Sequence, residues 1–357
     1  MMKQLKIGSR LVGAATPTYF IADIAANHDG ELDRAKLLIR SAKDAGADAA
    51  KFQNFTAHKI VSDVGFKSLG GQLSHQSKWK KSVFEVYQDA SVPHDWTPIL
   101  KEECDRVGID YFSSAYDFEA VDMLDPFVPA YKIGSGDIDW TEMLLHTARK
   151  GKPVFIATGA ATIADVVRAV ETLESVTDKL VLMQCNTNYT GSDANFDHIH
   201  LQVLRTYRAM FPEMILGLSD HTHGHTTVLG AVVLGATVVE KHFTDDNDRE
   251  GPDHAFAMNP SSWADMVTRT RELERALGSS RKFVADNEKE TALVQRRCLR
   301  AASVIRAGQT ISRDMIDVVR PATADAIRPP EIEAAVGTKA AVDIARGEAL
   351  TWTMLVR

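Results

Sequence analysis

Short apolar runs rich in β-branched and aromatic residues alternate with amphipathic stretches over most of the chain. The runs occupy residues 19–27, 49–55, 110–116, 130–135, 153–159, 179–186, 214–221 and 236–243. In the stretch between the first two, apolar residues share one helical face and a glycine follows as C-cap: Leu32, Ala35, Leu38, Ile39, Ala42 and Gly46. Eight strands that alternate with helices predict an α/β fold, specifically a (β/α)8 TIM barrel.

Polar residues stand at the ends of these runs, where an eight-stranded barrel builds its active site. They are lysines, serines, histidines and a glutamine at the ends of five of the runs: Lys51, Gln53, Ser113, Ser114, Lys132, Ser135, Ser219, His221 and His242. We therefore expect these side chains to take part in one active site.

The two histidines at strand ends suggest a metal site. The apolar stretch between the last two runs predicts a helix, which requires the two strands to be parallel. The ends of neighbouring strands lie about 5 Å apart, close enough for His221 and His242 to share one divalent cation. A single histidine at a strand end is more often a hydrogen-bonded structural residue, and His223 and His225, beyond the strand, are weaker candidates.

Lys51 and Lys132 are embedded in apolar runs, where an unpaired charge is costly. With nearby serine hydroxyls they suit a substrate that carries a carboxylate and a phosphate. The simpler alternative is a pair of solvated surface lysines. A rival function is a lyase or aldolase that forms a Schiff base on Lys132 or Lys241.

The chain changes character after a last helical pattern that ends near Gly278. We place a barrel domain at residues 1–283, a charged linker at 284–297 and a small β-rich domain at 298–357. The small domain contains an internal repeat, because residues 302–311 match residues 341–350 as two units of strand, glycine turn and strand. Residues 56–92 form a long polar connection and are a candidate lid or substrate loop.

Composition narrows the functions that these patterns allow. The chain is 45% hydrophobic and 25% charged, as in ordinary soluble globular proteins. A net charge of −7 argues against a nucleic acid partner, because phosphate binding needs a basic face. No signal peptide or membrane-spanning run is visible, and three widely spaced cysteines fit a reducing cytoplasm. We expect a cytoplasmic protein with no membrane partner.

Several strings stand in a fixed order along the chain: IADIAANHDG, AKFQ, FSSAYD, YKIGSGD, ATGA, GLSDHT, EKHFT, GPDHAFAMNP and VVRP. In this order they resemble the sialic acid synthase (N-acetylneuraminate synthase) family. The resemblance implies a TIM barrel followed by a β-rich antifreeze-like (SAF, β-clip) domain, assembled as a homodimer with swapped C-terminal domains. It also implies a transferase that joins phosphoenolpyruvate to N-acetylmannosamine, or a related N-acetylated six-carbon sugar, giving a nine-carbon sialic acid and phosphate.

The resemblance assigns roles to individual residues. His221 and His242 match the ligands of a divalent metal, Mn2+ or Mg2+. Asp23 occupies the place of a carboxylate on the first strand and is the candidate catalytic residue. The substrate sites take the remaining residues: Lys51, Lys132, Ser135, Ser219 and Ser114 for phosphoenolpyruvate, and Gln53, Tyr189, Asp253 and, from the partner subunit, Arg320 for the sugar.

Some positions depart from the family pattern. Asp23 and Asp137 stand where glutamate is common, and Ala157 replaces a serine that would help to hold phosphate. The sixth run ends CNTNYT rather than CTSEYP, and Ala322 follows VVRP in place of glycine. These departures leave the acceptor open, so a legionaminic or pseudaminic acid synthase acting on a di-acetamido sugar is the alternative. A carbohydrate- or ice-binding protein is a remote alternative, because that function would not explain the lysines and histidines at the strand ends.

Overall fold

The computed structural model describes residues 3–357, which belong to two compact units, Met1–Gly278 and Ser279–Arg357. The boundary follows directly on the last barrel helix, α11 (Pro260–Leu277). The stretch expected to be a linker contains a short helix, α12 (Lys289–Gln295), within the second unit. Within the described residues, no helix has both the length and the apolar character needed to cross a membrane.

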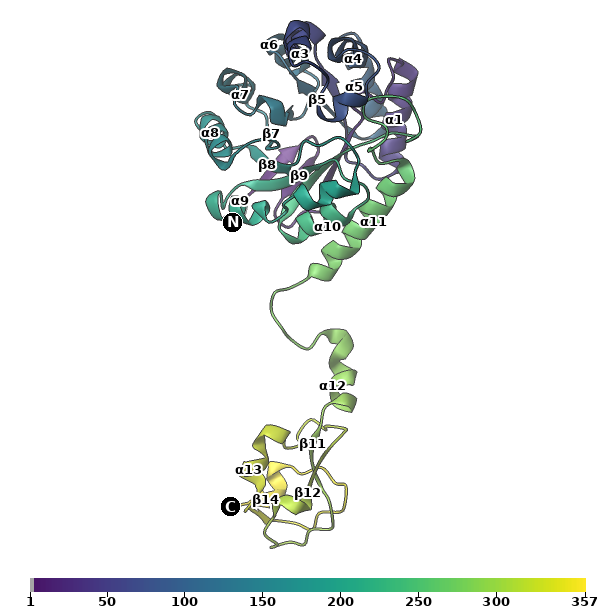
Figure 1. Cartoon of the computed structure of the whole chain (residues 1–357). Coiled ribbons are helices and arrows are strands. Elements are labelled where there is room, and N and C mark those ends of the chain that lie inside the picture. The colour runs from purple at the N-terminus through teal and green to yellow at the C-terminus, as the bar shows by residue number, and fades with distance from the viewer. Residues whose placement is uncertain (1–2) are drawn as a thin grey trace. The chain divides into compact units, whose positions relative to one another are not determined.

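The first unit is a closed barrel of eight parallel strands (Figure 1). The strands are β3 (Tyr19–Asp23), β4 (Ala49–Asn54), β5 (Asp110–Ala115), β6 (Tyr131–Ile133), β7 (Val154–Ala157), β8 (Leu180–Cys185), β9 (Ile215–Asp220) and β10 (Ala236–His242). Each strand pairs with the next one along the chain, and β10 pairs with β3 to close the ring. All eight strands predicted from the apolar runs are confirmed.

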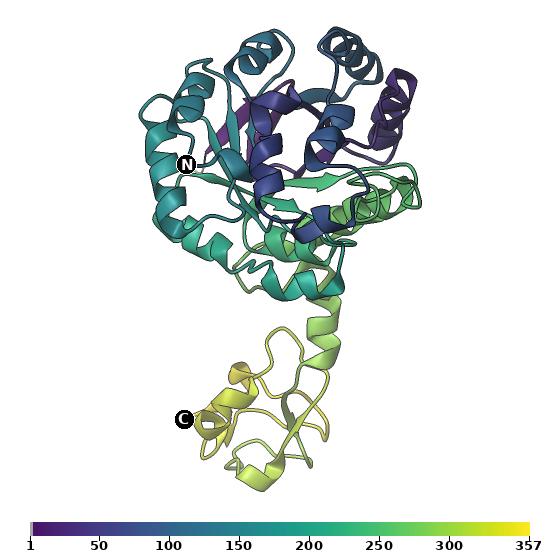
Figure 2. The same cartoon turned by 45° about the horizontal axis from the view of Figure 1, so that its top comes forward.

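Helices follow the strands and form a ring around the barrel (Figure 2). They are α1 (Leu32–Asp44), α5 (Trp96–Val107), α6 (Phe118–Leu124), α7 (Thr141–Ala148), α8 (Ile163–Glu174), α9 (Val203–Met210), α10 (Thr226–Val233) and α11. The apolar face predicted for α1 is buried in the core around the strands. Gly46 has a φ of 94°, the left-handed conformation that ends a helix and that glycine adopts without strain.

Side chains that point into the barrel change character along each strand. Near the N-terminal ends of the strands they are apolar and pack into one cluster: Tyr19, Ile21, Ala49, Phe112, Ala130, Phe155, Val181, Met183, Ile215 and Val238. An N-terminal hairpin, β1 (Gln4–Ile7) and β2 (Arg10–Gly13), adds Leu5, Ile7 and Val12 to this cluster. The barrel is therefore a packed core at this end, and room for a ligand is left at the C-terminal ends of the strands.

Residues 56–92, here called the lid segment, form ordered structure between β4 and α5. They contain α2 (Ala57–Ile60), α3 (Asp63–Ser68), the 3-10 helix η1 (Ser74–Lys78) and α4 (Val83–Ala90). Ser82 begins α4 with a reciprocal capping box to Glu85, which fixes the start of that helix.

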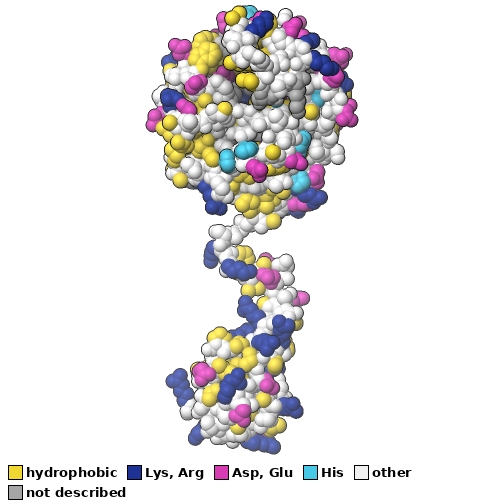
Figure 3. All heavy atoms as spheres, in the orientation of Figure 1, with side chains coloured by type: hydrophobic (Ala, Val, Ile, Leu, Met, Phe, Trp, Pro, Cys, Tyr) yellow, Lys and Arg dark blue, Asp and Glu magenta, His cyan; other side chains and the backbone are white. Residues whose placement is uncertain are grey.

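The second unit is built from two copies of one β motif. β11 (Cys298–Ala301) pairs antiparallel with β12 (Ile316–Val319), and β13 (Lys339–Ala340) pairs antiparallel with β14 (Leu355–Val356). Gly308 and Gly347 have matching φ angles of 82° and 81°, so the two matched segments repeat the same glycine turn. The predicted strands do not lie inside these segments: residues 302–311 and 341–350 contain only isolated bridges, and the named strands flank them. Lysine and arginine outnumber aspartate and glutamate in this unit, and basic side chains are spread over its visible face (Figure 3).

Candidate active site

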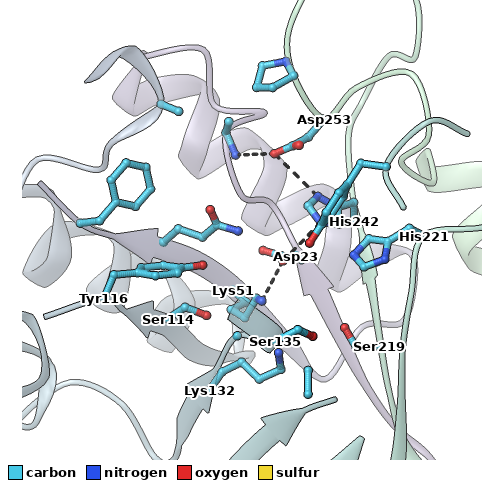
Figure 4. Close-up of a pocket in the computed structure, with 18 of the residues that line it drawn as sticks. Asp23, Lys51, Ser114, Tyr116, Lys132, Ser135, Ser219, His221, His242 and Asp253 are labelled. Carbon is cyan, nitrogen blue, oxygen red and sulfur yellow. Dashed lines mark hydrogen bonds and ion pairs between the residues drawn. The ribbon is translucent and has the colours of Figure 1, made fainter. Parts of the chain in front are cut away.

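A cavity opens at the C-terminal ends of the barrel strands (Figure 4). It is lined by eleven of the site residues that the sequence placed in the barrel unit: Asp23, Lys51, Gln53, Ser114, Lys132, Ser135, Tyr189, Ser219, His221, His242 and Asp253. Ser113, also expected there, does not line the cavity, because it alternates with Ser114 along β5 and its buried hydroxyl donates to Asn54 Oδ1. The strand residues among them continue the inward-facing positions beyond the apolar cluster, because side chains alternate along a strand. Arg320 belongs to the second unit, where it is exposed.

Four charged side chains form a network at the floor of the cavity, next to the apolar cluster. Lys51 Nζ lies 2.7 Å from Asp23 Oδ2 and 3.1 Å from Glu240 Oε1. Lys132 Nζ lies 3.3 Å from the same oxygen of Glu240, to which Ser219 donates a hydrogen bond of 3.2 Å. None of the four charged residues is more than 4% exposed. Two buried lysines are thus balanced by two carboxylates.

The network keeps both partners of the Lys51–Glu240 contact charged. Burial would raise the pKa of Glu240, but Lys132 and Lys51 outweigh this effect and hold that pKa at about 2. Burial would lower the pKa of Lys51, but the charges of Asp23 and Glu240 raise it above its ordinary value. The pKa of Asp23 is raised, because burial outweighs the attraction of Lys51. A carboxylate with a raised pKa is a better proton acceptor.

Several buried polar atoms of the cavity have no hydrogen-bond partner among the described residues. Four of them belong to barrel strands: Asp23 Oδ1, Ser114 Oγ, Glu240 Oε2 and His242 Nδ1. Buried polar groups in folded proteins are nearly always hydrogen-bonded, so these atoms are suited to meet a ligand, a water or a metal. Their convergence from three strands indicates a binding site.

The two histidines lie next to each other, with ring centroids 5.4 Å apart. The Nδ1–H group of His221 donates to the carbonyl of Asn186 across 2.8 Å, which leaves Nε2 free to bind a metal. Burial and the neighbouring His242 lower the pKa of His221 to about 3. Burial and Lys51 lower the pKa of His242 to about 3. Both imidazoles are therefore neutral at pH 7, the form that binds metals.

These donors fit a divalent cation that keeps open coordination positions. The cavity offers two neutral imidazoles, and the unpartnered atoms of His242 and Asp23 lie in it as well. Among residues 3–357, no group of three or more His, Cys, Asp or Glu side chains is arranged to hold a metal alone. The remaining ligands of such a cation would be substrate or water, as in catalytic metal sites.

Asp253 stands on the other side of His242, in the loop that follows β10. Its Oδ2 lies 3.8 Å from His242 Nδ1 and accepts a hydrogen bond of 3.4 Å from the Ala26 amide. Burial and the charge of Asp23 raise the pKa of Asp253 to about 7. The cavity thus has a third carboxyl group, which lies on the histidine side and forms no ion pair with either lysine of the network.

Aromatic rings form much of the cavity wall. The ring centroids of Tyr189 and His75 lie 4.9 Å apart, and Phe55 lies 5.6 Å from both Tyr87 and Tyr116. His75 and Tyr87 belong to the lid segment, which therefore contributes directly to the cavity.

Sequence reasoning missed Glu240, Cys185 and Tyr116 as site residues, although all three line the cavity. Glu240 and Cys185 stand two positions after the inward-facing Val238 and Met183 on the same strands. Strict alternation along each strand would have identified both. Cys185 is a free buried thiol, like the other two cysteines.

Lys241, named as a Schiff-base candidate, is not a cavity residue. Its ammonium group forms an ion pair with Asp220 and donates to the carbonyl of Thr222 across 2.6 Å. The side chain is 1% exposed and points away from the barrel interior, because it alternates with Glu240 and His242. A Schiff base on Lys241 is inconsistent with this position.

The two histidines that follow His221 also lie outside the cavity lining. His223 contacts the carbonyl of Gly191, and His225 Nδ1 lies 3.2 Å from Asp265 Oδ2. Neither is therefore placed to share a metal with His221 and His242.

The chain is similar to known proteins over nearly its whole length. Residues 38–282 match the NeuB family and residues 296–356 match the SAF domain. The chain is 32% identical to N,N'-diacetyllegionaminic acid synthase of Legionella pneumophila, with 95% of each chain covered. It is 33% identical to N-acetylneuraminate-9-phosphate synthase of Mus musculus, covering 87% of this chain and 85% of that one.

A solved structure shows the same relationship. N-acetylneuraminic acid (sialic acid) synthetase from Leptospira borgpetersenii, in complex with citrate, superimposes with a TM-score of 0.71 at 26% identity, covering 82% of this chain and 95% of that chain. The family match includes most of the barrel, and the SAF match includes the repeated β motif. The chain therefore belongs to the NeuB family of sialic acid synthases and is an enzyme of that type.

Proposed function

We propose that this enzyme condenses phosphoenolpyruvate with N-acetylmannosamine, or a related N-acetylated six-carbon sugar, to give a nine-carbon sialic acid and phosphate. The observation that carries the proposal is the meeting of two buried lysines and two neutral histidines in one cavity. The lysines suit a highly anionic substrate, and the histidines suit a metal that activates an aldehyde.

Phosphoenolpyruvate binds at the cavity floor in this assignment. Lys51 and Lys132 supply positive charge, and Ser114, Ser135 and Ser219 supply hydroxyl groups. Ala157 also lines the cavity but offers no hydroxyl, so these three serines carry that role.

Gly159 allows the backbone to come close to this end of the cavity. Its amide donates to Ser135 Oγ across 2.9 Å, which orients the hydroxyl. A Cβ atom at Gly159 would lie 2.4 Å from Thr187 and 2.9 Å from Ser135, so a larger residue would displace this serine.

The acceptor sugar binds between the histidines and the aromatic wall. A divalent cation, Mn2+ or Mg2+, held by His221 and His242 would act as a Lewis acid on the aldehyde oxygen of the acceptor. Gln53, Tyr189 and Asp253 line the cavity and offer amide, phenol and carboxyl groups to the sugar hydroxyls.

Asp23 acts as the base that accepts a proton from water in this assignment. The C3 carbon of phosphoenolpyruvate forms a bond to the aldehyde carbon, water adds to C2, and phosphate leaves from C2. Asp23 orients this water and accepts its proton, a role that suits its raised pKa. Lys51, 2.7 Å away, fixes the position of the carboxylate.

A di-acetamido sugar is the alternative acceptor and would lead to legionaminic or pseudaminic acid. The similarity to N,N'-diacetyllegionaminic acid synthase over 95% of both chains keeps this acceptor in the panel, and the 33% identity to N-acetylneuraminate-9-phosphate synthase keeps the first one. The chemistry at the floor of the cavity is the same for both acceptors.

We also infer that a second copy of the chain completes the site. Arg320 is exposed in the second unit, and a guanidinium group can donate two hydrogen bonds to one oxygen-rich acceptor. In a homodimer with swapped C-terminal domains, Arg320 reaches the acetamido group of a sugar bound in the partner's barrel.

The proposal is tested by supplying phosphoenolpyruvate, Mn2+ and a panel of six-carbon amino sugars to the full-length protein. Phosphate release that needs both substrates, with a nine-carbon product seen by mass spectrometry, supports it. No release with any acceptor overturns it. Borohydride trapping with a keto acid tests the rival, because a covalent adduct on Lys132 would indicate Schiff-base chemistry.

A further inference from the structure

We propose that Lys241 and Asp220 are positioning residues that hold His221 and His242 in the arrangement needed to bind a divalent metal. The inference rests on the proposed function, because it concerns the same metal site. Neither residue lines the cavity.

The two residues occupy equivalent places on neighbouring strands. Lys241 on β10 and Asp220 on β9 are register partners, and each directly precedes one of the histidines. Side chains alternate along a strand, so Lys241 and Asp220 face the outer side of the barrel while the histidines face the cavity. Because Lys241 and Asp220 are bonded directly to His242 and His221, a shift of the first two residues also moves the two histidines.

The ammonium group of Lys241 contacts both residues that flank His221, the side chain of one and the backbone of the other. The Lys241 side chain contacts the carboxylate of Asp220 and donates to the carbonyl oxygen of Thr222 across 2.6 Å. Residues 220 and 222 flank His221 in the sequence, and Lys241 is the neighbour of His242. The strand β9 ends at Asp220, so ladder hydrogen bonds no longer fix the chain at this point. Beyond the end of β9, the ammonium group of Lys241 holds the chain in place of the ladder hydrogen bonds.

The carboxylate of Asp220 has further donors that fix its orientation. The hydroxyls of Thr222 and Thr227 each donate to Asp220 Oδ2 across 2.8 Å. Thr227 lies in the first turn of α10, so the network joins two strand ends and a helix. The side chains of Lys241 and Asp220 are 1% and 0% exposed. Removing one member of a fully buried pair leaves a charge without compensation.

The Lys241–Asp220 pair lies next to the histidines, whereas a second buried carboxylate of the barrel lies far from them. Asp48 is also a buried carboxylate and accepts a hydrogen bond of 2.9 Å from the Phe20 amide. It stands before β4, at the opposite end of the barrel from the histidines. Asp48→Asn is therefore a matched control: it perturbs a buried carboxylate of the same barrel without touching the strand ends that carry the metal ligands.

The test measures the affinity of the full-length protein for Mn2+ without substrates, from the loss of the free Mn2+ electron paramagnetic resonance signal. Lys241→Met should raise the Mn2+ dissociation constant about 10- to 100-fold, as is typical when the groups that orient metal ligands are lost. Lys241→Arg keeps a cation and should restore most of the affinity. Asp48→Asn should lower the melting temperature but leave the Mn2+ affinity unchanged.

Three outcomes overturn the inference: a cooperatively melting Lys241→Met protein with wild-type Mn2+ affinity, an equal loss of affinity in Asp48→Asn, or a wild-type protein that binds no Mn2+. If Lys241→Met does not fold, Thr227→Val removes one donor to Asp220 with little change in shape. Weaker Mn2+ binding by Thr227→Val then supports the inference, and unchanged binding overturns it. The proposed function fails separately, through the absence of phosphate release.

Discussion

Asp23 and His242 are register partners on the two strands that close the barrel, and Asp23 Oδ2 lies 3.6 Å from His242 Nε2. On its other side, Asp23 is the register partner of Lys51 on β4. Three adjacent strands therefore place a candidate metal ligand, a candidate base and a candidate anion-binding cation in one row across the cavity.

The role of Asp23 as a base predicts the effect of removing its charge. Asp23→Asn should lower kcat by about 10²–10⁴-fold, because an amide cannot accept a proton from the attacking water. Steady-state phosphate release checks this, with circular dichroism to confirm the fold. Asp23→Glu keeps the carboxylate and should retain more activity than Asp23→Asn. Wild-type kcat in Asp23→Asn would remove Asp23 from the mechanism.

Metal removal gives the second prediction. Chelation should abolish turnover and added Mn2+ should restore it, because two neutral imidazoles are the protein ligands available for the cation. The His221→Ala, His242→Ala double variant should not recover when Mn2+ is added. His223→Ala serves as the control, since this histidine lies outside the cavity lining, and it should behave like the wild type. Full activity of the double variant without metal would contradict the assignment.

The third prediction concerns phosphoenolpyruvate. Removing one charge-assisted contact costs about 1.5–3 kcal/mol, so Lys132→Ala should weaken phosphoenolpyruvate binding roughly tenfold or more. Isothermal titration calorimetry measures this directly. Lys150→Ala removes a lysine that pairs with Asp122 at the surface, and it should bind phosphoenolpyruvate normally. Equal affinities for the wild type and Lys132→Ala would show that the lysine does not contact this substrate.

Assembly of the site from two chains gives the fourth prediction. Arg320→Ala and His242→Ala chains, each impaired alone, should regain part of the activity when their subunits are exchanged. In the mixed dimer one site receives both defects and the other receives neither. Truncation after Gly278 should remove activity even when the barrel folds. Mixed dimers that form, yet are no more active than either parent, would place Arg320 in its own chain's site or in none.

Acid should destabilise the barrel through His28. Burial lowers the pKa of this fully buried histidine to about 4, and its Nδ1 accepts a hydrogen bond of 3.0 Å from the Gly30 amide. The ordinary pKa is about 6.5, so between pH 6.5 and 4 the unfolded chain binds a proton that the folded chain does not. The contribution of His28 to stability is full above pH 6.5 and falls through this window by on the order of 3 kcal/mol.

Chemical denaturation between pH 7 and pH 4.5 measures this loss. His28→Gln should show a flatter dependence of the unfolding free energy on pH than the wild type. His94→Gln changes an exposed histidine and should keep the wild-type dependence. Parallel curves for His28→Gln and the wild type would show that another group causes the acid sensitivity.

Much of the fold could be predicted because barrel strands are buried on both sides and read as apolar runs. The ends of the strands were less predictable. The first run extends to Asn27, but β3 ends at Asp23, and Ala25 has a φ of 45° that a strand does not allow. The fourth run shortens to three residues, because the chain turns into a 3-10 helix at Ser135.

Site residues could be predicted where a single polar residue ends a strand. Contacts between side chains of different strands could not be predicted. Glu240 joins Lys51 and Lys132, which lie on strands far from it in the sequence, and only the closed ring brings the three together. The outward position of Lys241 follows from alternation, but its partner depends on the register of β9 against β10. Register is a property of the assembled barrel.

The packed N-terminal end of the barrel has a kinetic consequence. Leu5, Ile7 and Val12 of the hairpin and the inward apolar residues of the strands separate the cavity from that end. A molecule bound at the floor must therefore arrive before one bound nearer the rim, and must depart after it. If phosphoenolpyruvate binds at the floor and the sugar nearer the rim, as proposed above, the two substrates should therefore bind in a compulsory order, with phosphoenolpyruvate first and the sugar second.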